Sequence, residues 1–206
     1  MINVLIVDDF VTNGIYIKKL LDEGKYDVKT VISGLQALNY IDSGKKVDII
    51  LLDINMPEMD GIEVLKRIRQ RPNYKHTPII FVTGNADRNK VLDGFINGID
   101  DVLAKPVEAA FLNERVTRAL RGETPVQQYK KRNSDDIEGL DRLYNNLVDE
   151  FNEDFASLGL KLQDVGTNTA SADNDDNGQN GYESDDDEAA ESYGLDFSSI
   201  IGQNLW

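Results

Sequence analysis

Five short apolar runs alternate with segments of helical periodicity over the first 120 residues, and no other feature constrains the fold as strongly. The runs are INVLIV (2–7), YDVKTV (26–31), VDIILL (47–52), PIIFVT (78–83) and DDVLA (100–104). Strands that alternate with helices are typical of a parallel sheet covered on both faces. We therefore predict an α/β domain built on five parallel strands.

Apolar residues recur at helical spacing in the segments between and after these runs. The residues concerned are Ile15, Leu20 and Leu21; Leu35, Leu38 and Ile41; Ile62, Leu65 and Ile68; Val91, Leu92 and Phe95; and Phe111, Leu112, Val116 and Leu120. The first, third and fourth runs are almost wholly apolar, as inner strands are. The run 26–31 alternates apolar and polar residues, as an edge strand does.

Polar side chains stand at the ends of four predicted strands. The first run ends in Asp8 and Asp9, the third in Asp53 and the fourth in Thr83, and Lys105 follows the fifth. Ligands of open α/β sheets bind at the carboxyl ends of the strands. We therefore expect three carboxylates, one hydroxyl and one ammonium group to meet at one edge of the sheet.

This set of groups suits magnesium-dependent phosphoryl chemistry. Adjacent carboxylates raise one another's pKa unless a cation neutralises them, and Mg2+ takes one or two carboxylates, waters and a phosphate. Lys105 brings a point charge suited to a phosphoryl oxygen, and Thr83 brings a hydroxyl donor. Asp53 is then the candidate nucleophile of an aspartyl-phosphate chemistry.

Each of these residues has a simpler interpretation when it is taken alone. An acid or a threonine at a strand end often just caps a turn or the start of a helix. That interpretation does not explain the set, since chance rarely places an acid pair, an acid, a hydroxyl and a lysine on four ends of one five-strand pattern.

Residues 1–121 resemble the receiver domain of two-component response regulators. The resemblance rests on LIVDD for the acid pair, LLDINMPEMDG for the phosphorylation loop, FVTG for the hydroxyl position and DDVLAKP for the lysine and proline. It implies a flavodoxin-like, doubly wound (βα)5 fold with strand order 2-1-3-4-5. It also implies a protein that is not an enzyme, beyond catalysing its own phosphorylation and dephosphorylation.

The resemblance implies a role for each acidic residue of the site. Asp53 would accept a phosphoryl group from a histidine of a partner kinase or histidine phosphotransfer protein. Asp9, Asp53 and the backbone carbonyl of Asn55 would hold Mg2+, and Asp8 would assist through water.

The resemblance also implies how the site responds to phosphorylation. Lys105 would contact the phosphoryl group, Thr83 would move toward it, and the Lys105–Pro106 bond is expected to be cis. The side chains of Asn55 and Asn85 would flank the site and tune how long the phosphate lasts.

One position departs from the family pattern. Three residues before the lysine, such domains often carry a tyrosine or phenylalanine that rotates inward on phosphorylation, whereas this chain has Val102. Activation would then rely on Thr83 and backbone shifts, or the neighbouring face would be used differently. No catalytic residue is lost, so phosphorylation is still expected.

Composition excludes several classes of protein. The chain has no cysteine and a single histidine, which rules out disulfides, thiolate chemistry and a histidine-based metal site. No apolar run approaches a membrane span and no signal sequence is evident, so we expect a cytoplasmic protein without membrane insertion. The net charge is −15, and no lysine or arginine follows residue 161, which argues against DNA binding.

The chain after the receiver pattern divides into two further parts. We predict a receiver domain over 1–122, a linker and an amphipathic helix over 123–165, and a disordered acidic tail with an apolar C-terminal motif over 166–206. The polar stretch 122–136 reads as the linker, and the helix follows over 137–162.

The helix and the tail each have more than one interpretation. Ile137, Leu140, Tyr144, Leu147 and Phe151 form a stripe that either packs on the receiver domain, forms a short coiled coil or docks on a partner. The tail either folds back or binds a partner's groove through its apolar end. The residues assigned to that contact are Phe197, Ile200, Ile201, Leu205 and Trp206.

A calcium loop in the tail is disfavoured. DNDDNGQNGYES (173–184) matches the first half of an EF-hand loop, but its twelfth position is Ser184 where a bidentate glutamate belongs. We read the segment as a solvated acidic spacer.

Three functions remain open at this point. The first is a phosphorylation-controlled regulator that binds an unidentified downstream protein through its C-terminal extension. The second is a phosphotransfer intermediate or phosphate sink with no output of its own. The third is an acidic tail that mimics nucleic acid, whose binding to a basic partner would collapse with salt.

Overall fold

The computed structural model describes residues 1–21, 24–84 and 88–132, and seven single residues between 142 and 156. Its sheet has the strand order β2-β1-β3-β4-β5, and every neighbouring pair is parallel. The strands are β1 (Ile2–Val7), β2 (Tyr26–Val31), β3 (Ile49–Asp53), β4 (Ile79–Thr83) and β5 (Asp101–Ala104). The predicted flavodoxin-like order, with β2 at one edge, is confirmed.

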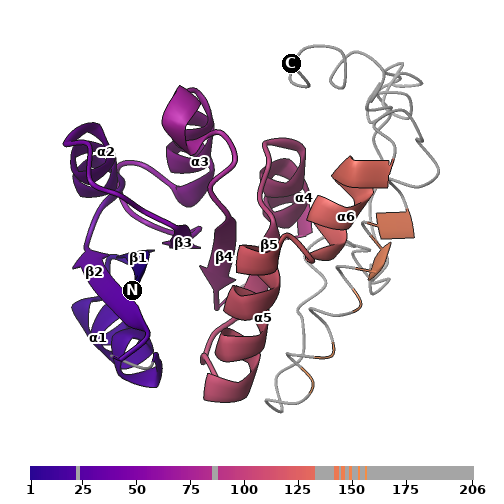
Figure 1. Cartoon of the computed structure of the whole chain (residues 1–206), viewed down its shortest axis with the longest axis horizontal. Helices are drawn as coiled ribbons and strands as arrows, with labels where there is room; N and C mark the ends of the chain where they lie inside the picture. Colours follow the sequence, from indigo (N-terminus) through magenta and orange to yellow (C-terminus); the bar gives the residue numbers. More distant parts are fainter. Residues whose placement is uncertain are drawn as a thin grey trace, which may run out of the picture. The chain divides into compact units, whose positions relative to one another are not determined.

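Helices cover both faces of this sheet. Helices α2, α3 and α4 lie on one face, and α1 and α5 lie on the other (Figure 1). Their bounds are α1 (Val11–Leu20), α2 (Gly34–Asp42), α3 (Gly61–Arg69), α4 (Arg88–Ile96) and α5 (Ala109–Arg121), with a 3-10 turn η1 (Pro72–Tyr74) and a further helix α6 (Pro125–Arg132).

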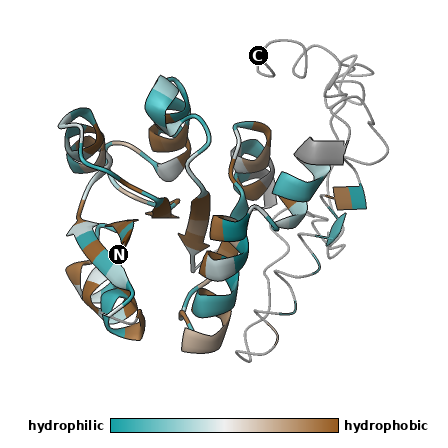
Figure 2. Cartoon of the chain, in the orientation of Figure 1, coloured by the Kyte–Doolittle hydropathy of each residue, from teal (hydrophilic) through white to brown (hydrophobic). Residues whose placement is uncertain are grey.

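The inner strands are continuously apolar because alternate residues enter two different cores. Ile49 and Leu51 of β3 pack with α1 and α5, whereas Ile50 and Leu52 pack with α2, α3 and α4. Both faces of an inner parallel strand are therefore buried. Figure 2 shows the resulting contrast between the uniformly hydrophobic β4 and the mixed edge strand β2.

A sharp turn carries the chain from α5 into α6. Gly122 adopts a left-handed conformation (φ 70°), and its N–H donates to the carbonyl of Ala119, which ends α5. Thr124 then caps α6 reciprocally: the Gln127 N–H donates to the Thr124 hydroxyl, and the Thr124 N–H donates to the Gln127 side-chain oxygen, both at 3.1 Å. Pro125 begins the helix, where its missing N–H costs nothing.

Helix α6 corrects the interpretation of 122–136 as a simple linker. Val126 is 1% exposed and belongs to the same core cluster as Val102 and Ala104 of β5, and Tyr129 packs against that cluster. Leu143 is also buried in it. Although β5 is an edge strand, all four of its residues are buried. The polar composition of this stretch concealed two apolar side chains, Val126 and Tyr129, that pack in or against this core cluster.

Two residues with helical spacing do not face the sheet as expected. Ile15 of α1 is 48% exposed and Leu35 of α2 is 57% exposed. In α1 the buried large apolar residue is Ile17, whereas in α2 the predicted Leu38 and Ile41 are buried, together with Ala37. The spacing alone could not distinguish the two sides of a helix that carries apolar residues on both.

Several sequence predictions lie outside the described residues. They are the side chain of Asn85, the stripe residues Ile137, Leu140, Tyr144, Leu147 and Phe151, the segment 173–184 and the apolar end of the tail. Over the part of the chain that is described, no helix has the length and apolar character needed to cross a membrane.

Candidate phosphorylation site

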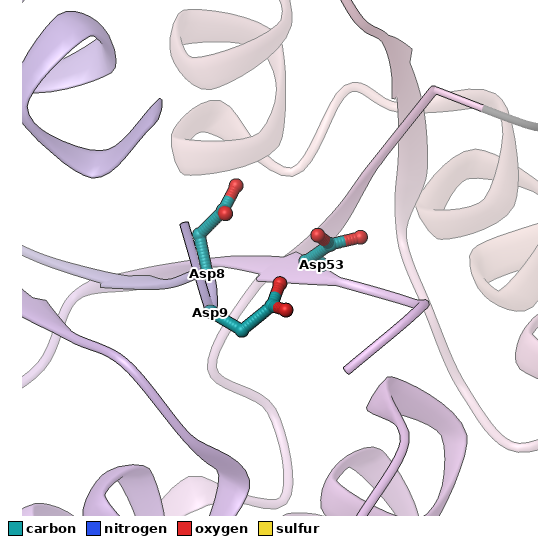
Figure 3. Close-up of side chains that lie close together, drawn as sticks. All are labelled: Asp8, Asp9 and Asp53. Atoms are coloured by element: carbon teal, nitrogen blue, oxygen red, sulfur yellow. The ribbon is translucent and has the colours of Figure 1, made fainter. Parts of the chain in front are cut away.

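The predicted site residues meet at the carboxyl edge of the sheet. Asp8 and Asp9 follow β1, and Asp53 ends the neighbouring strand β3. The ligand atoms of these three acids lie within 4.8 Å of one another, and Figure 3 shows their carboxylates gathered around one space. The strand order therefore produces the acidic cluster that the sequence predicted.

Lys105 joins two of these acids. Its ammonium lies 2.6 Å from Asp53 Oδ2 and 2.7 Å from Asp8 Oδ2. Burial lowers the pKa of Lys105, but the hydrogen bonds to Asp53 and Asp8 outweigh that effect, so the pKa is raised overall. Lys105 directly follows β5, and its N–H donates to the carbonyl of Thr83 at the end of β4. The Lys105–Pro106 bond is cis, as expected.

The Asp53 carboxylate is held in an unfavourable environment for a negative charge. Burial raises its pKa, and the contact with Lys105 offsets only part of that rise. The charge of Asp8 raises the pKa further. A cation bound beside Asp53 would remove this penalty and favour the ionised, nucleophilic form.

The donor set fits a divalent, oxygen-seeking cation. Asp8 Oδ1 is engaged by the N–H of Phe10 and by the side chain of Asn13, whereas Asp9 Oδ1 is buried without a hydrogen-bond partner. Three carboxylates and one ammonium leave an excess of two negative charges, provided that all three acids are ionised. Such a charge and an unmatched oxygen suit Mg2+.

The loop after Asp53 is fixed by close packing of α3. Asp60 caps this helix by accepting the N–H of Glu63 at 2.9 Å. A Cβ added at Gly61 would lie 2.3 Å from the carbonyl oxygen of Asp53, so only glycine permits this approach. The Asn55 N–H donates to Asp53 Oδ1 at 3.1 Å. The motif ending in Asp60 and Gly61 thus shapes the surroundings of the nucleophile.

The predicted switch positions lie on β4, which neighbours the strand of Asp53, and on the edge strand β5. Thr83 is fully buried at the end of β4 and pairs with Ala104 of β5. Val102 is 4% exposed in the core on the α2, α3 and α4 side. Both residues therefore lie on the side of Asp53 that leads to the β5 edge of the sheet.

Two features of the site were missed in the sequence. Lys90 of α4 donates to the side-chain oxygen of Asn55 at 2.8 Å, and a single lysine on a helix gives no signal of such a contact. Exposed apolar side chains also lie on the segments that follow β1 and β2, including α1 and the first turn of α2. They are Phe10, Val11, Ile15, Tyr16, Ile32 and Leu35.

Known proteins share this sequence pattern. The family model for the response regulator receiver domain matches residues 4–117. Chemotaxis protein CheY-3 of Vibrio cholerae is 36% identical over 116 residues, which cover 56% of this chain and 88% of that protein. Response regulator PleD of Caulobacter vibrioides is 31% identical over 129 residues, which cover 63% of this chain and 28% of that protein.

Solved structures share the fold as well. Vibrio cholerae chemotaxis protein CheY4 is 32% identical, with a TM-score of 0.55 and coverage of 58% of this chain and 98% of that chain. A CheY-like response regulator receiver domain protein from Methanospirillum hungatei is 26% identical, with a TM-score of 0.56 and coverage of 60% and 96%.

Proposed function

This chain belongs to the response regulator receiver domain family, and on that premise we propose that it is phosphorylated on Asp53 with the help of Mg2+ and signals through its C-terminal extension. The observation that carries the proposal is the position of the Lys105 ammonium between Asp8 and Asp53, next to the unmatched oxygen of Asp9. We propose no enzymatic activity beyond the formation and loss of the phosphoryl group.

The residues of the cluster have distinct roles in the proposed reaction. A carboxylate oxygen of Asp53 attacks the phosphorus of a phosphohistidine, the phosphorus–nitrogen bond breaks, and the imidazole leaves as a neutral ring because its other nitrogen is already protonated. Asp9, Asp53 and the Asn55 carbonyl would hold Mg2+, with Asp8 acting through water. The bound ion supplies positive charge to the transferring group.

Lys105 and Thr83 would complete the site. The ammonium of Lys105 exchanges its contact with the free carboxylate for one with a phosphoryl oxygen, which stabilises the charge that develops there. The hydroxyl of Thr83 donates to a second phosphoryl oxygen. Asn55 and Asn85 would set the lifetime of the phosphorylated state.

The exposed apolar residues beside Asp9 suit the docking of a histidine kinase or histidine phosphotransfer protein. The Asp8 N–H donates to the carbonyl of Val31, so the loops after β1 and β2 are adjacent at this edge. Phe10 of the first loop is 62% exposed, and Leu35 in the first turn of α2, which follows the second loop, is 57% exposed. Exposed apolar groups of this size are typical of interaction surfaces.

Replacing Phe10 or Ile15 with alanine should therefore slow phosphotransfer from a protein donor. We expect a loss of about tenfold in transfer efficiency, since central apolar contacts carry much of the binding energy of an interface. Phosphorylation by acetyl phosphate serves as the control, because this small donor does not need the surface. Equal losses with both donors would contradict the docking role.

We place the output at the edge that α6 covers. The backbone link from Lys105 to Thr83 joins the site to the end of β5, and Val126 is buried in the same cluster as Val102 of that strand. A shift of Thr83 toward the phosphoryl group would alter the surface on which α6 packs. The extension would then become available to a downstream protein. Because this route does not need an aromatic side chain at position 102, Val102 is compatible with signalling.

Hydrogen exchange with and without beryllofluoride and Mg2+ tests this output. We expect the amides of 125–132 to exchange faster in the activated protein, while those of α2 stay unchanged. Asp53→Ala should remove the response, and Val126→Asp should give fast exchange without activation. A pull-down with the same proteins, and with 1–122 as a further bait, should capture a partner only when the extension is present and exposed.

The phosphotransfer intermediate is the second candidate. It is favoured by the match to chemotaxis protein CheY-3, because the aligned part of this chain covers 88% of that protein. If activation leaves the exchange of 125–132 unchanged and only a histidine-containing donor is captured, equally by 1–122, the sink interpretation replaces the output that we propose.

A further inference from the structure

The side chain of Asn55 is held by a lysine from another element. Lys90 lies in α4, and its ammonium donates to Asn55 Oδ1 at 2.8 Å. The backbone N–H of the same asparagine donates to Asp53 Oδ1 at 3.1 Å. Asn55 is exposed and Lys90 is half-buried, so the contact lies at the mouth of the site.

The contact decides which end of the Asn55 amide is available to other groups. An asparagine side chain has one acceptor oxygen and one NH2 group, whereas an ammonium has only donors. The Lys90 ammonium takes one of the two lone pairs of this oxygen, so the NH2 group is the freer end of the amide toward a phosphoryl group or a water nearby. Lys90 thus orients the side chain of Asn55, a residue whose backbone N–H donates to the carboxylate of Asp53.

We propose that Lys90 is a positioning residue that prolongs phosphorylation by occupying the side-chain oxygen of Asn55. The inference rests on the proposed function, since it concerns the loss of the phosphoryl group from Asp53. In that step a water oxygen bonds to phosphorus, and the bond from phosphorus to the Asp53 carboxylate breaks. Both water protons leave with the phosphate as dihydrogen phosphate.

The attacking water needs an acceptor that orients it. The Asn55 oxygen is a candidate because this residue follows the nucleophile by two positions and lies at its exposed side. A charge-assisted hydrogen bond from Lys90 competes with the water for that oxygen. Removing the ammonium frees the acceptor and should speed hydrolysis.

A general tether of α4 is the competing explanation. Lys66 of α3 lies 3.6 Å from Asp93 of α4 and so also ties this helix to a neighbour. Lys66→Met is therefore a matched control, since it removes a lysine contact to α4 away from Asn55. A tethering role would make both lysine variants behave alike.

The test measures how long the aspartyl phosphate survives in the full-length chain after the phosphodonor is removed. We expect Lys90→Met to shorten this lifetime roughly three- to tenfold, the range for one ordinary hydrogen bond. Lys90→Arg should restore much of it, and Lys66→Met should leave it unchanged. In an Asn55→Ala background, Lys90→Met should have no further effect.

A second readout needs neither phosphate nor metal. The side-chain NH2 resonances of Asn55 in the NMR spectrum of the metal-free protein should shift in Lys90→Met and not in Lys66→Met. The role of Lys90 would be overturned by any of three results: an unchanged lifetime in Lys90→Met, an effect of Lys90→Met that persists without Asn55, or equal effects of the two lysine variants. None of these results would contradict phosphorylation of Asp53. If the wild-type chain takes up no phosphoryl group, the proposed function fails and this inference fails with it.

Discussion

Asp53→Asn is expected to abolish phosphorylation and, at neutral pH without Mg2+, to raise the melting temperature. The amide cannot act as a nucleophile, although it keeps the size of the side chain. Burial raises the pKa of Asp53, with the Lys105 contact offsetting only part of the rise, so the ionised carboxylate is less stable in the folded chain than in the unfolded one. Removing that charge should raise the melting temperature by roughly 2–6 °C.

The pH dependence checks the cause of this stabilisation. A carboxyl whose pKa is raised in the folded state destabilises the fold above that pKa, and the penalty fades as the pH falls toward the ordinary value of 3.8. The difference between wild type and Asp53→Asn should therefore shrink on acidification. Mg2+ should stabilise the wild type more than the variant. A variant that is less stable at neutral pH would contradict the electrostatic account of the site.

Arg69→Met is expected to cause a large loss of stability, because it removes a mostly buried guanidinium from several hydrogen bonds and an ion pair. The guanidinium donates to the carbonyls of Gly98, Tyr74 and Thr77, and it lies 3.1 Å from Asp100 Oδ2. Methionine keeps the apolar stem but leaves the carbonyls and a buried carboxylate without this partner. We expect a loss on the order of 3 kcal/mol in the free energy of unfolding.

Denaturation in urea measures this loss, and two variants control it. Arg67→Met removes an exposed pair with Glu63 on the same helix and should change stability little. Arg69→Met combined with Asp100→Asn should recover part of the loss, because the buried carboxylate that lost its arginine is then replaced by a neutral amide. Since the network lies at the amino ends of β4 and β5, phosphorylation of the folded Arg69→Met protein should persist. Equal effects of Arg67→Met and Arg69→Met would refute the role of the network.

The strands and the site were predictable because their signals are local or follow from one topological rule. Ile49 to Leu52 form an apolar run because the strand is buried on both faces. Once parallel strands were inferred, their carboxyl ends had to meet at one edge, which brought Asp53 to Asp8 and Lys105. Magnesium-dependent phosphoryl chemistry was then predictable from the types of these residues: three carboxylates, one hydroxyl and one ammonium group.

Other features could not be predicted because they depend on which side of an element faces its neighbour. Ile15 and Leu35 have the spacing of core residues but lie exposed near the site. Val126 sits in a polar stretch, and its burial depends on the turn that Gly122 and Thr124 direct back onto the sheet edge. The contact between Lys90 and Asn55 joins residues 35 positions apart in the sequence.

The most direct test of the central claim is intact-protein mass spectrometry after incubation with acetyl phosphate and Mg2+, followed by borohydride reduction and peptide mapping. We expect the mass of one phosphoryl group, its absence when EDTA replaces Mg2+, and reduction of residue 53 to homoserine. Uptake without a divalent cation, a phosphoryl group on another residue, or no uptake by a folded chain would contradict the assignment of Asp53 as the magnesium-dependent nucleophile.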